Sequence, residues 1–180
     1  MIVVGSSWPS DIEIIELFLT NRMSDYRVLI APHNVSESEI ESLERTFPDS
    51  VRYSQADGNI DQSVMLIDNI GMLSSIYRYA DFVIIGGAFR GALHNTLEAA
   101  VYGVPIFFGE HQNNQKFKEA IDLIKAGGAF AFKSSNHIDM IFSTLEEEQA
   151  YENACNSSKE FVVSKTGATD LVVSKIFELI

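Results

Sequence analysis

The sequence predicts an α/β protein with a doubly wound, largely parallel sheet of about six strands. Two features predict this fold. Short apolar runs rich in β-branched residues alternate along the chain with segments of helix-forming composition. The apolar runs also end in polar or glycine-containing loops, as parallel strands do at the edge of a sheet that binds ligands. We therefore expect the functional residues in the loops that follow the strands.

The strands are predicted from apolar runs that end in glycine, proline or polar residues. The expected strands are 2–4, 26–31, 64–68, 82–85, 104–108 and the edge strand 129–132, with 51–53 as a further short one. The first of them begins almost at residue 1, so we expect a chain that starts at a domain boundary.

The helices are predicted from capping patterns and from apolar residues at helical spacing. In the first of them, Ser10 and Glu13 form a capping box, and the apolar residues that follow fall on one side. The expected helices are 11–21, 36–47, 71–79, the one that begins at Asn95, 116–125, 136–145, 146–163 and 168–180.

The composition excludes several classes of protein. At 180 residues and 46% hydrophobic, the chain is long enough for one domain, residues 1–180, with a sizeable core. A net charge of -12 argues against sequence-independent binding of nucleic acid. The single cysteine, Cys155, excludes an internal disulfide and fits a reducing compartment. No apolar stretch reaches the roughly 18 to 20 residues that span a bilayer, so we expect a soluble, cytoplasmic chain.

The stretch 82–100 carries the strongest functional signal. Residues 82–85 form an uninterrupted apolar run, as expected of a central strand covered on both faces. Gly86, Gly87 and Gly91 then allow close approaches that side chains would block. Asn95 is placed to cap a helix, and Glu98 lies one turn into it. A glycine loop and a helix start after a strand are typical of sites for phosphates or carboxylates.

The local patterns also allow simpler interpretations. The central stretch could be only a tight connection between a strand and a helix, in which Glu98 complements the helix dipole. Ser6, after the first strand, could donate a hydrogen bond to a ligand or serve in the turn. His33, after the second strand, could bind a ligand or be an ordinary surface residue. From the residues alone these alternatives stay open.

Five motifs follow the predicted strands in order. They are Gly5-Ser6-Ser7-Trp8, Ala31-Pro32-His33, Asp68-Asn69-Ile70-Gly71-Met72-Leu73, Gly86-Gly87 through His94-Asn95-Thr96-Leu97-Glu98, and Gly103-Val104-Pro105 with Gly109 and the segment 115–120. Together they resemble the 3-deoxy-D-manno-octulosonic acid (Kdo) transferases of lipid A assembly, and more narrowly their carboxyl-terminal half. The resemblance covers nearly the whole chain. It implies a GT-B glycosyltransferase, in which two Rossmann-like domains face each other across a cleft and the second binds the donor, CMP-Kdo.

The resemblance implies a CMP-Kdo site made from three of these loops. The family's CMP contacts fall on Pro32, His33, Ile70, Gly71, Met72, Asn95, Thr96, Leu97 and Glu98. Glu98 is expected to hold the ribose hydroxyls, and the glycine loop and helix start to face the phosphate. Ser6, Gly87 and Arg90 are further candidates for donor contacts.

Two positions depart from the family pattern. Where many members have an arginine after the proline, this chain has His33, and a histidine ordinarily carries its charge only below about pH 6.5. Where many members have a glutamate after the glycine, this chain has Met72, which offers no carboxylate. Because Arg90 is the cation of the glycine loop, we hypothesise that it supplies positive charge where the arginine is missing.

The resemblance assigns no catalytic residue to this chain. In the family the general base is a glutamate on the amino-terminal acceptor domain, which we expect to be absent here. The implied reaction is inverting transfer of Kdo from CMP-Kdo to a lipid A precursor, with no metal and no cofactor. The full-length protein would act at the cytoplasmic face of the bacterial inner membrane. We expect this chain alone to bind CMP and to transfer nothing.

Other functions remain open. A GT-B transferase that uses a UDP-sugar would bind UDP in preference to CMP. A stand-alone nucleotide-binding or regulatory module would have no transferase partner. A dinucleotide-binding oxidoreductase is disfavoured, because the first strand ends in Gly5-Ser6-Ser7 and lacks the G-x-G-x-x-G turn.

Overall fold

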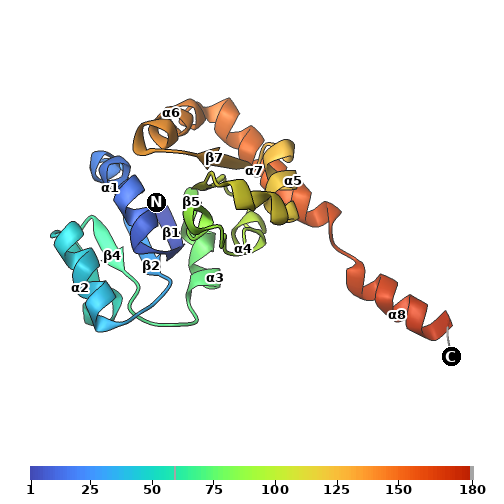
Figure 1. Ribbon diagram of the computed structural model, residues 1–180, viewed down its shortest axis with the longest axis horizontal. Helices are drawn as coiled ribbons and strands as arrows, with labels where there is room; N and C mark the ends of the chain where they lie inside the picture. The colour runs from blue at the N-terminus through green and yellow to red at the C-terminus, as the bar shows by residue number, and fades with distance from the viewer. Residues whose placement is uncertain (59, 179–180) are drawn as a thin grey trace.

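The computed structural model describes residues 1–58 and 60–178, and its strands form one parallel sheet (Figure 1). The strand order is β3-β4-β2-β1-β5-β6-β7. The strands are β1 (Ile2–Ser7), β2 (Val28–Pro32), β3 (Ser50–Arg52), β4 (Val64–Leu66), β5 (Phe82–Ile85), β6 (Ile106–Gly109) and β7 (Ala129–Phe132). The predicted doubly wound fold is confirmed, and β7 is an edge strand as expected. The sheet has seven strands rather than about six, because the short β3 also pairs with β4.

The chain winds outward from β1 in both directions. It first builds β2, β3 and β4 on one side of β1, and then returns to place β5 on the other side. β1 and β5 pair from Ile2 with Phe82 to Gly5 with Ile85. The direction of winding therefore reverses between β1 and β5. In doubly wound sheets, the carboxyl ends of the strands at this reversal form the usual ligand crevice.

The helices lie close to their predicted positions, but two are shorter than expected. They are α1 (Pro9–Arg22), α2 (Glu37–Thr46), α3 (Leu73–Ile76), α4 (Leu97–Ala100), α5 (Lys118–Ala126), α6 (Ser135–Leu145), α7 (Glu148–Ser164) and α8 (Ala168–Glu178). The helix predicted to begin at Asn95 is the single turn α4. Gly103 adopts a left-handed φ of 68° soon after it, and Pro105 cannot continue a helix, so the chain turns into β6. The helix predicted at 71–79 is likewise one turn, α3, followed by a 3₁₀ turn at Tyr77–Tyr79.

The first helix begins earlier than predicted. Pro9 occupies its first position, where the missing N–H group is no loss, and Trp8 precedes it as the cap. The carboxylate of Asp11 accepts a hydrogen bond from the Trp8 N–H at 2.9 Å. The predicted capping box of Ser10 and Glu13 is therefore wrong, because Asp11 provides the acceptor for the helix start.

Two apolar layers cover the sheet. Helices α1, α2 and α6 pack on one face, and α3, α4 and α5 pack on the other, while α7 contributes its first half to the former layer and its second half to the latter (Figure 1). The side chains of β5 alternate between them, with Phe82 and Ile84 in the first layer and Val83 and Ile85 in the second. All four are buried. The prediction of a central strand covered on both faces is confirmed.

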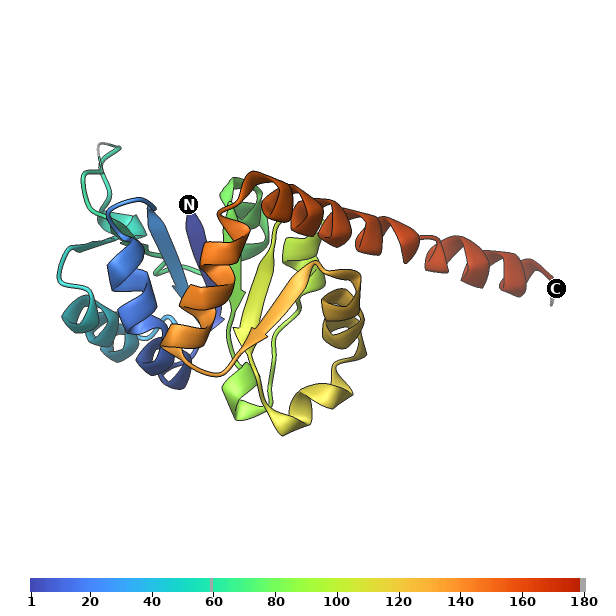
Figure 2. The same cartoon turned by 90° about the horizontal axis from the view of Figure 1, so that it is seen from above.

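Helix α8 projects away from the rest of the structure (Figure 2). Its large apolar side chains at Leu171, Ile176 and Phe177 are exposed. Among residues 1–58 and 60–178, no helix is long and apolar enough to cross a membrane.

Candidate functional site

The carboxyl ends of β1 and β5 are in direct backbone contact. The Gly86 N–H donates a hydrogen bond to the Gly5 carbonyl oxygen at 2.9 Å. A Cβ atom on Gly86 would collide with the Ser6 carbonyl oxygen and would lie 2.7 Å from the Ser7 Cα, so only glycine fits. Ser6 itself has a left-handed φ of 53°, which is uncommon for a residue with a side chain. Such strain is typical of functional turns.

Four side chains from three loops gather at this edge, and we call Trp8, His33, Arg90 and His94 the ring cluster. The rings of Trp8 and His33 stack with their centroids 4.1 Å apart and their planes at 22°. The guanidinium carbon of Arg90 lies 4.1 Å from the centroid of the Trp8 ring. The rings of His33 and His94 have centroids 4.8 Å apart. The ring cluster therefore joins the loops after β1, β2 and β5.

Arg90 lies close to the histidine whose charge it was proposed to supplement. Both Arg90 and His33 contact the ring of Trp8, and both side chains are exposed. An exposed cation over an indole ring gains roughly 0.5 to 1 kcal/mol. The contact is weak enough for a ligand to compete with it, so the role of Arg90 in binding an anion stays a prediction.

A buried carboxylate ties the start of α1 to the glycine loop. Asp11 is 3% exposed. Its Oδ2 atom accepts hydrogen bonds from the N–H groups of Trp8 at 2.9 Å and Gly87 at 2.8 Å. Burial raises the pKa of Asp11, whereas these two N–H groups and the nearby charges of His94 and Arg90 lower it. Asp11 thus holds Gly87, which has a left-handed φ of 86°, against the turn after β1.

The turn between β1 and α1 also concentrates unpartnered polar atoms. Over the described part of the chain, five buried side-chain atoms lack a hydrogen-bond partner. Four of them belong to this turn: Ser7 Oγ, Trp8 Nε1, Ser10 Oγ and Asp11 Oδ1. Each such atom costs about 1 to 3 kcal/mol when it stays unpaired. Native proteins keep few such groups, and those they keep call for an explanation such as a functional role or bound water.

Asn95 and Glu98 form a local pair in front of α4. The N-cap position of α4 is Thr96, but Asn95 Oδ1 accepts a hydrogen bond from the Leu97 N–H at 3.0 Å, so Asn95 partners the first free N–H of the helix as predicted. Asn95 Nδ2 donates to Glu98 Oε1 at 3.1 Å and thereby fixes the exposed carboxylate. Thr96 between them is buried. Because α4 is a single turn, however, the helix dipole supports an anion less than the sequence predicted.

A cavity of about 270 Å³ lies against this loop. It is lined by residues 93–97 from the loop and the short helix, and by Phe117, Glu119 and Ala120 at the start of α5. The predicted donor contacts Asn95, Thr96 and Leu97 therefore border a space of useful size.

The loop after β4 reaches the same edge through Tyr77. Ile70 is 86% exposed, Gly71 has a left-handed φ of 98°, and Met72 is half-buried. Tyr77 is buried, and its hydroxyl lies so close to Gly5 that a side chain there would overlap it. Burial and the charge of Glu98 raise the pKa of Tyr77. Tyr77 thus connects the loop after β4 with Gly5 and Glu98.

The structure brings the predicted site residues to one edge, with Pro32 buried and His33 exposed at the end of β2. Sequence reasoning missed Trp8, Asp11 and His94 as members of the site. Trp8 and His94 lie inside two of the five motifs, in the loops after β1 and β5, and that position was the available signal. Asp11 gave no such signal, because an acidic residue in a first helical turn is ordinary.

The chain is similar in sequence to several 3-deoxy-D-manno-octulosonic acid transferases. The chain is 29% identical to the 3-deoxy-D-manno-octulosonic acid transferase of Chlamydophila psittaci over 160 residues, which cover 84% of this chain and 36% of that protein. It is 32% identical to the transferase of the same name from Bordetella pertussis over 109 residues, covering 59% of this chain and 25% of that protein. The chain thus spans well under half the length of these relatives. No family model matches it.

Solved structures agree with these relatives. The C-terminal CMP-Kdo binding domain of WaaA from Acinetobacter baumannii superposes with a TM-score of 0.75 at 18% identity, covering 89% of this chain and 88% of that one. The C-terminal domain of the glycosyl transferase LpcC from Francisella tularensis gives a TM-score of 0.60 at 13% identity, covering 93% and 86%. The predicted resemblance to Kdo transferases is confirmed, and so is the predicted fold, a doubly wound parallel sheet like that of these C-terminal domains.

Proposed function

We propose that this chain is the donor-binding part of a glycosyltransferase that transfers Kdo from CMP-Kdo. One observation carries the proposal. The three loops expected to contact CMP, at 32–33, 70–72 and 95–98, all lie at the carboxyl edge, beside the reversal of winding between β1 and β5. The similarity to the C-terminal CMP-Kdo binding domain of WaaA supports the same ligand.

Each loop contributes a different chemistry. The exposed carboxylate of Glu98, fixed by Asn95, accepts hydrogen bonds from the ribose hydroxyls. His94 of the ring cluster directly precedes Asn95, and the cluster provides Arg90 and the two imidazoles for the phosphate. The cavity beside Leu97 and Phe117 accommodates an apolar or planar group. No residue of this chain is assigned the proton transfer.

The remaining parts of the reaction belong to the full-length protein. We propose that its acceptor is a lipid A precursor and that its general base lies on an amino-terminal acceptor domain. We further propose that transfer needs no metal and takes place at the cytoplasmic face of the inner membrane. On this view the 180-residue chain binds the donor and transfers nothing by itself.

The first test is calorimetric titration of the 180-residue chain with CMP and with UMP. We expect CMP to bind and UMP to bind at least tenfold more weakly. Preferential binding of UMP would replace the proposal with a transferase that uses a UDP-sugar. No binding of either nucleotide at millimolar concentration would overturn the assignment of a donor site to this chain.

The second test is the substitution Glu98→Gln. The amide keeps one acceptor oxygen for Asn95 but removes the charged acceptor for the ribose, so CMP should bind about tenfold more weakly. Glu148→Gln, at an exposed position at the start of α7, is the matched control and should leave the affinity unchanged. Equal affinities for the two variants would show that Glu98 does not touch the nucleotide.

A further inference from the structure

Two imidazole rings of the ring cluster face the region where the donor phosphate is expected. His33 and His94 come from positions 61 residues apart in the chain, yet their ring centroids are 4.8 Å apart. The His33 side chain is exposed and that of His94 is half-buried. His94 directly precedes Asn95, which fixes Glu98. A nucleotide whose ribose lies on Glu98 therefore has its 5′-phosphate within reach of this pair.

The charges around the pair come from four elements. Asp11 of α1 and Glu98 of α4 raise the pKa of His94, whereas burial and the neighbouring His33 at the end of β2 lower it. The fourth element is the 3₁₀ turn Ala88–Arg90, whose Arg90 lies over Trp8. Burial and His33 outweigh the two carboxylates, so the pKa of His94 is lowered and its imidazole is mostly neutral at pH 7 when no ligand is bound.

The position of the acidic neighbours leaves room for an anion. Asp11 Oδ2 already accepts two backbone N–H groups, and the side chain is 3% exposed, so its charge is directed into the protein. Glu98 accepts a hydrogen bond from Asn95, the residue after His94. The exposed ring of His33 and the guanidinium of Arg90 are the groups that a ligand would meet first.

We propose that His33 and His94 bind the phosphodiester of the donor as a pair and take up a proton when it binds. The inference rests on the proposed function, because it assumes a nucleotide on Glu98. A negatively charged oxygen near two imidazoles favours their charged forms and offsets their mutual repulsion. The permanent cation that many relatives of this fold would use is thus replaced by a pair whose charge depends on pH.

The sign of the pH effect follows directly. Protonated histidine binds the anion, so affinity should rise as pH falls. If binding raises the pKa of one imidazole by about one unit, affinity should be several-fold higher at pH 6 than at pH 8. The same rise predicts that a fraction of a proton is taken up per ligand at pH 7.

The test uses the 180-residue chain and the methyl ester of CMP, whose phosphodiester keeps one negative charge throughout this pH range. Calorimetry at pH 6, 7 and 8, in two buffers with different ionisation enthalpies, measures both the affinity and the proton uptake. Cytidine serves as the uncharged ligand and should bind with no such pH dependence.

The variants His33→Gln and His94→Gln should each reduce the proton uptake and flatten the pH dependence. His137→Gln is the matched control, because His137 lies at the start of α6, outside the ring cluster, and should leave both quantities unchanged. The retention of a folded chain is checked by circular dichroism for each variant.

The possible results separate this inference from the proposed function. Tighter binding of the ester at pH 6, with proton uptake reduced in both variants, supports the histidine pair. Binding of the ester that is equal at pH 6 and pH 8 overturns the inference and leaves the donor site intact. If neither the ester nor cytidine binds, the proposed function fails and the inference fails with it.

Discussion

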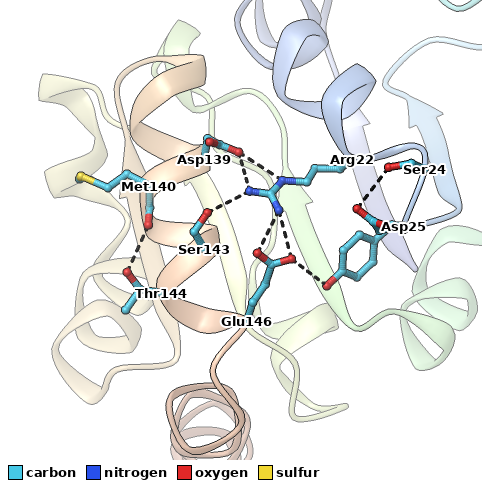
Figure 3. Close-up of polar contacts among 9 residues, drawn as sticks. Arg22, Ser24, Asp25, Asp139, Met140, Ser143, Thr144 and Glu146 are labelled. Atoms are coloured by element: carbon cyan, nitrogen blue, oxygen red, sulfur yellow. Dashed lines mark hydrogen bonds and ion pairs between the residues drawn. The ribbon is translucent and has the colours of Figure 1, made fainter.

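Helix α1 has a polar cluster at each end, and the two clusters differ in how completely their hydrogen bonds are satisfied. At its last turn, Arg22 is fully engaged (Figure 3). It donates hydrogen bonds to Asp139 at 2.6 Å, to Glu146 at 2.9 Å and to Ser143 at 3.0 Å, and its guanidinium lies over the ring of Phe142 at 4.8 Å. At the first turn, by contrast, the residues from Ser7 to Asp11 leave four buried polar atoms without partners.

The difference indicates what each cluster is for. The Arg22 network closes the contact between α1, α6 and the start of α7, and it lies at the amino-terminal edge of the sheet, far from the ring cluster. A satisfied network of this kind stabilises the packing of helices. The β1–α1 turn instead keeps strained backbone and unpaired polar groups at the edge where we propose that the donor binds, a pattern typical of functional sites.

The largest effect should come from Gly86→Ala. A methyl group there collides with the backbone of the β1–α1 turn, so we expect the free energy of unfolding to fall by about 3 kcal/mol and CMP binding to be lost. Denaturant unfolding and calorimetry measure the two effects. Gly167→Ala is the control, because Gly167 has a left-handed φ of 98° but open space around it, and should cost about 1 kcal/mol with no change in binding. If the Gly86→Ala variant were as stable as the Gly167→Ala variant, the β1–α1 turn would have moved to accommodate the added methyl group.

The next effect should come from Arg22→Met. This change keeps the apolar contact with Phe142 but removes the charged hydrogen bonds to two carboxylates, so we expect a loss of about 2 kcal/mol of stability. CMP affinity should stay the same, since the network lies at the other end of α1. Arg45→Met removes an exposed pair that is 4.0 Å long and should change little. Weaker CMP binding by the Arg22 variant would contradict the division between the two clusters.

The smallest effect should come from the titration of Asp11. Burial raises the pKa of Asp11 above the ordinary carboxyl value of 3.8. Between the pKa of the unfolded state and that of the folded state, the folded protein therefore holds the proton more strongly than the unfolded chain does. The contribution of Asp11 to stability therefore falls as pH rises through this range. Asp11→Asn removes this titration, and the stability of the variant relative to the parent chain should increase from pH 4 to pH 7. Urea unfolding at several pH values measures the slope, and a slope of opposite sign would mean that the hydrogen bonds from Trp8 and Gly87 outweigh burial.

The Glu98 substitution and the pH dependence of the histidine pair extend the comparison to the ligand. Both should change nucleotide binding without changing stability, because Glu98 and His33 are exposed. Substitution of a residue in the Arg22 network should instead lower stability without changing nucleotide binding. Measuring both quantities for every variant therefore separates the two clusters without reference to any other protein.

The sequence alone determined the order of the helices and strands and which loops carry the candidate site residues. Apolar runs such as 82–85 and the glycines after them are local signals, and each depends on residues that are neighbours in the chain. The capping of Leu97 by Asn95 was predictable for the same reason. The family motifs are also local, since each one spans a single loop.

Only the tertiary structure decided which loops touch and how. The stacking of Trp8 on His33 and the bond from Gly87 to Asp11 depend on the placement of β1 beside both β2 and β5. The pairing of the short β3 and the early end of α4 likewise depend on the strands and turns around them. Residues 11 and 87 lie far apart in the chain, so no sequence pattern relates them. Their contact is fixed by the strand order, which brings distant loops to one edge.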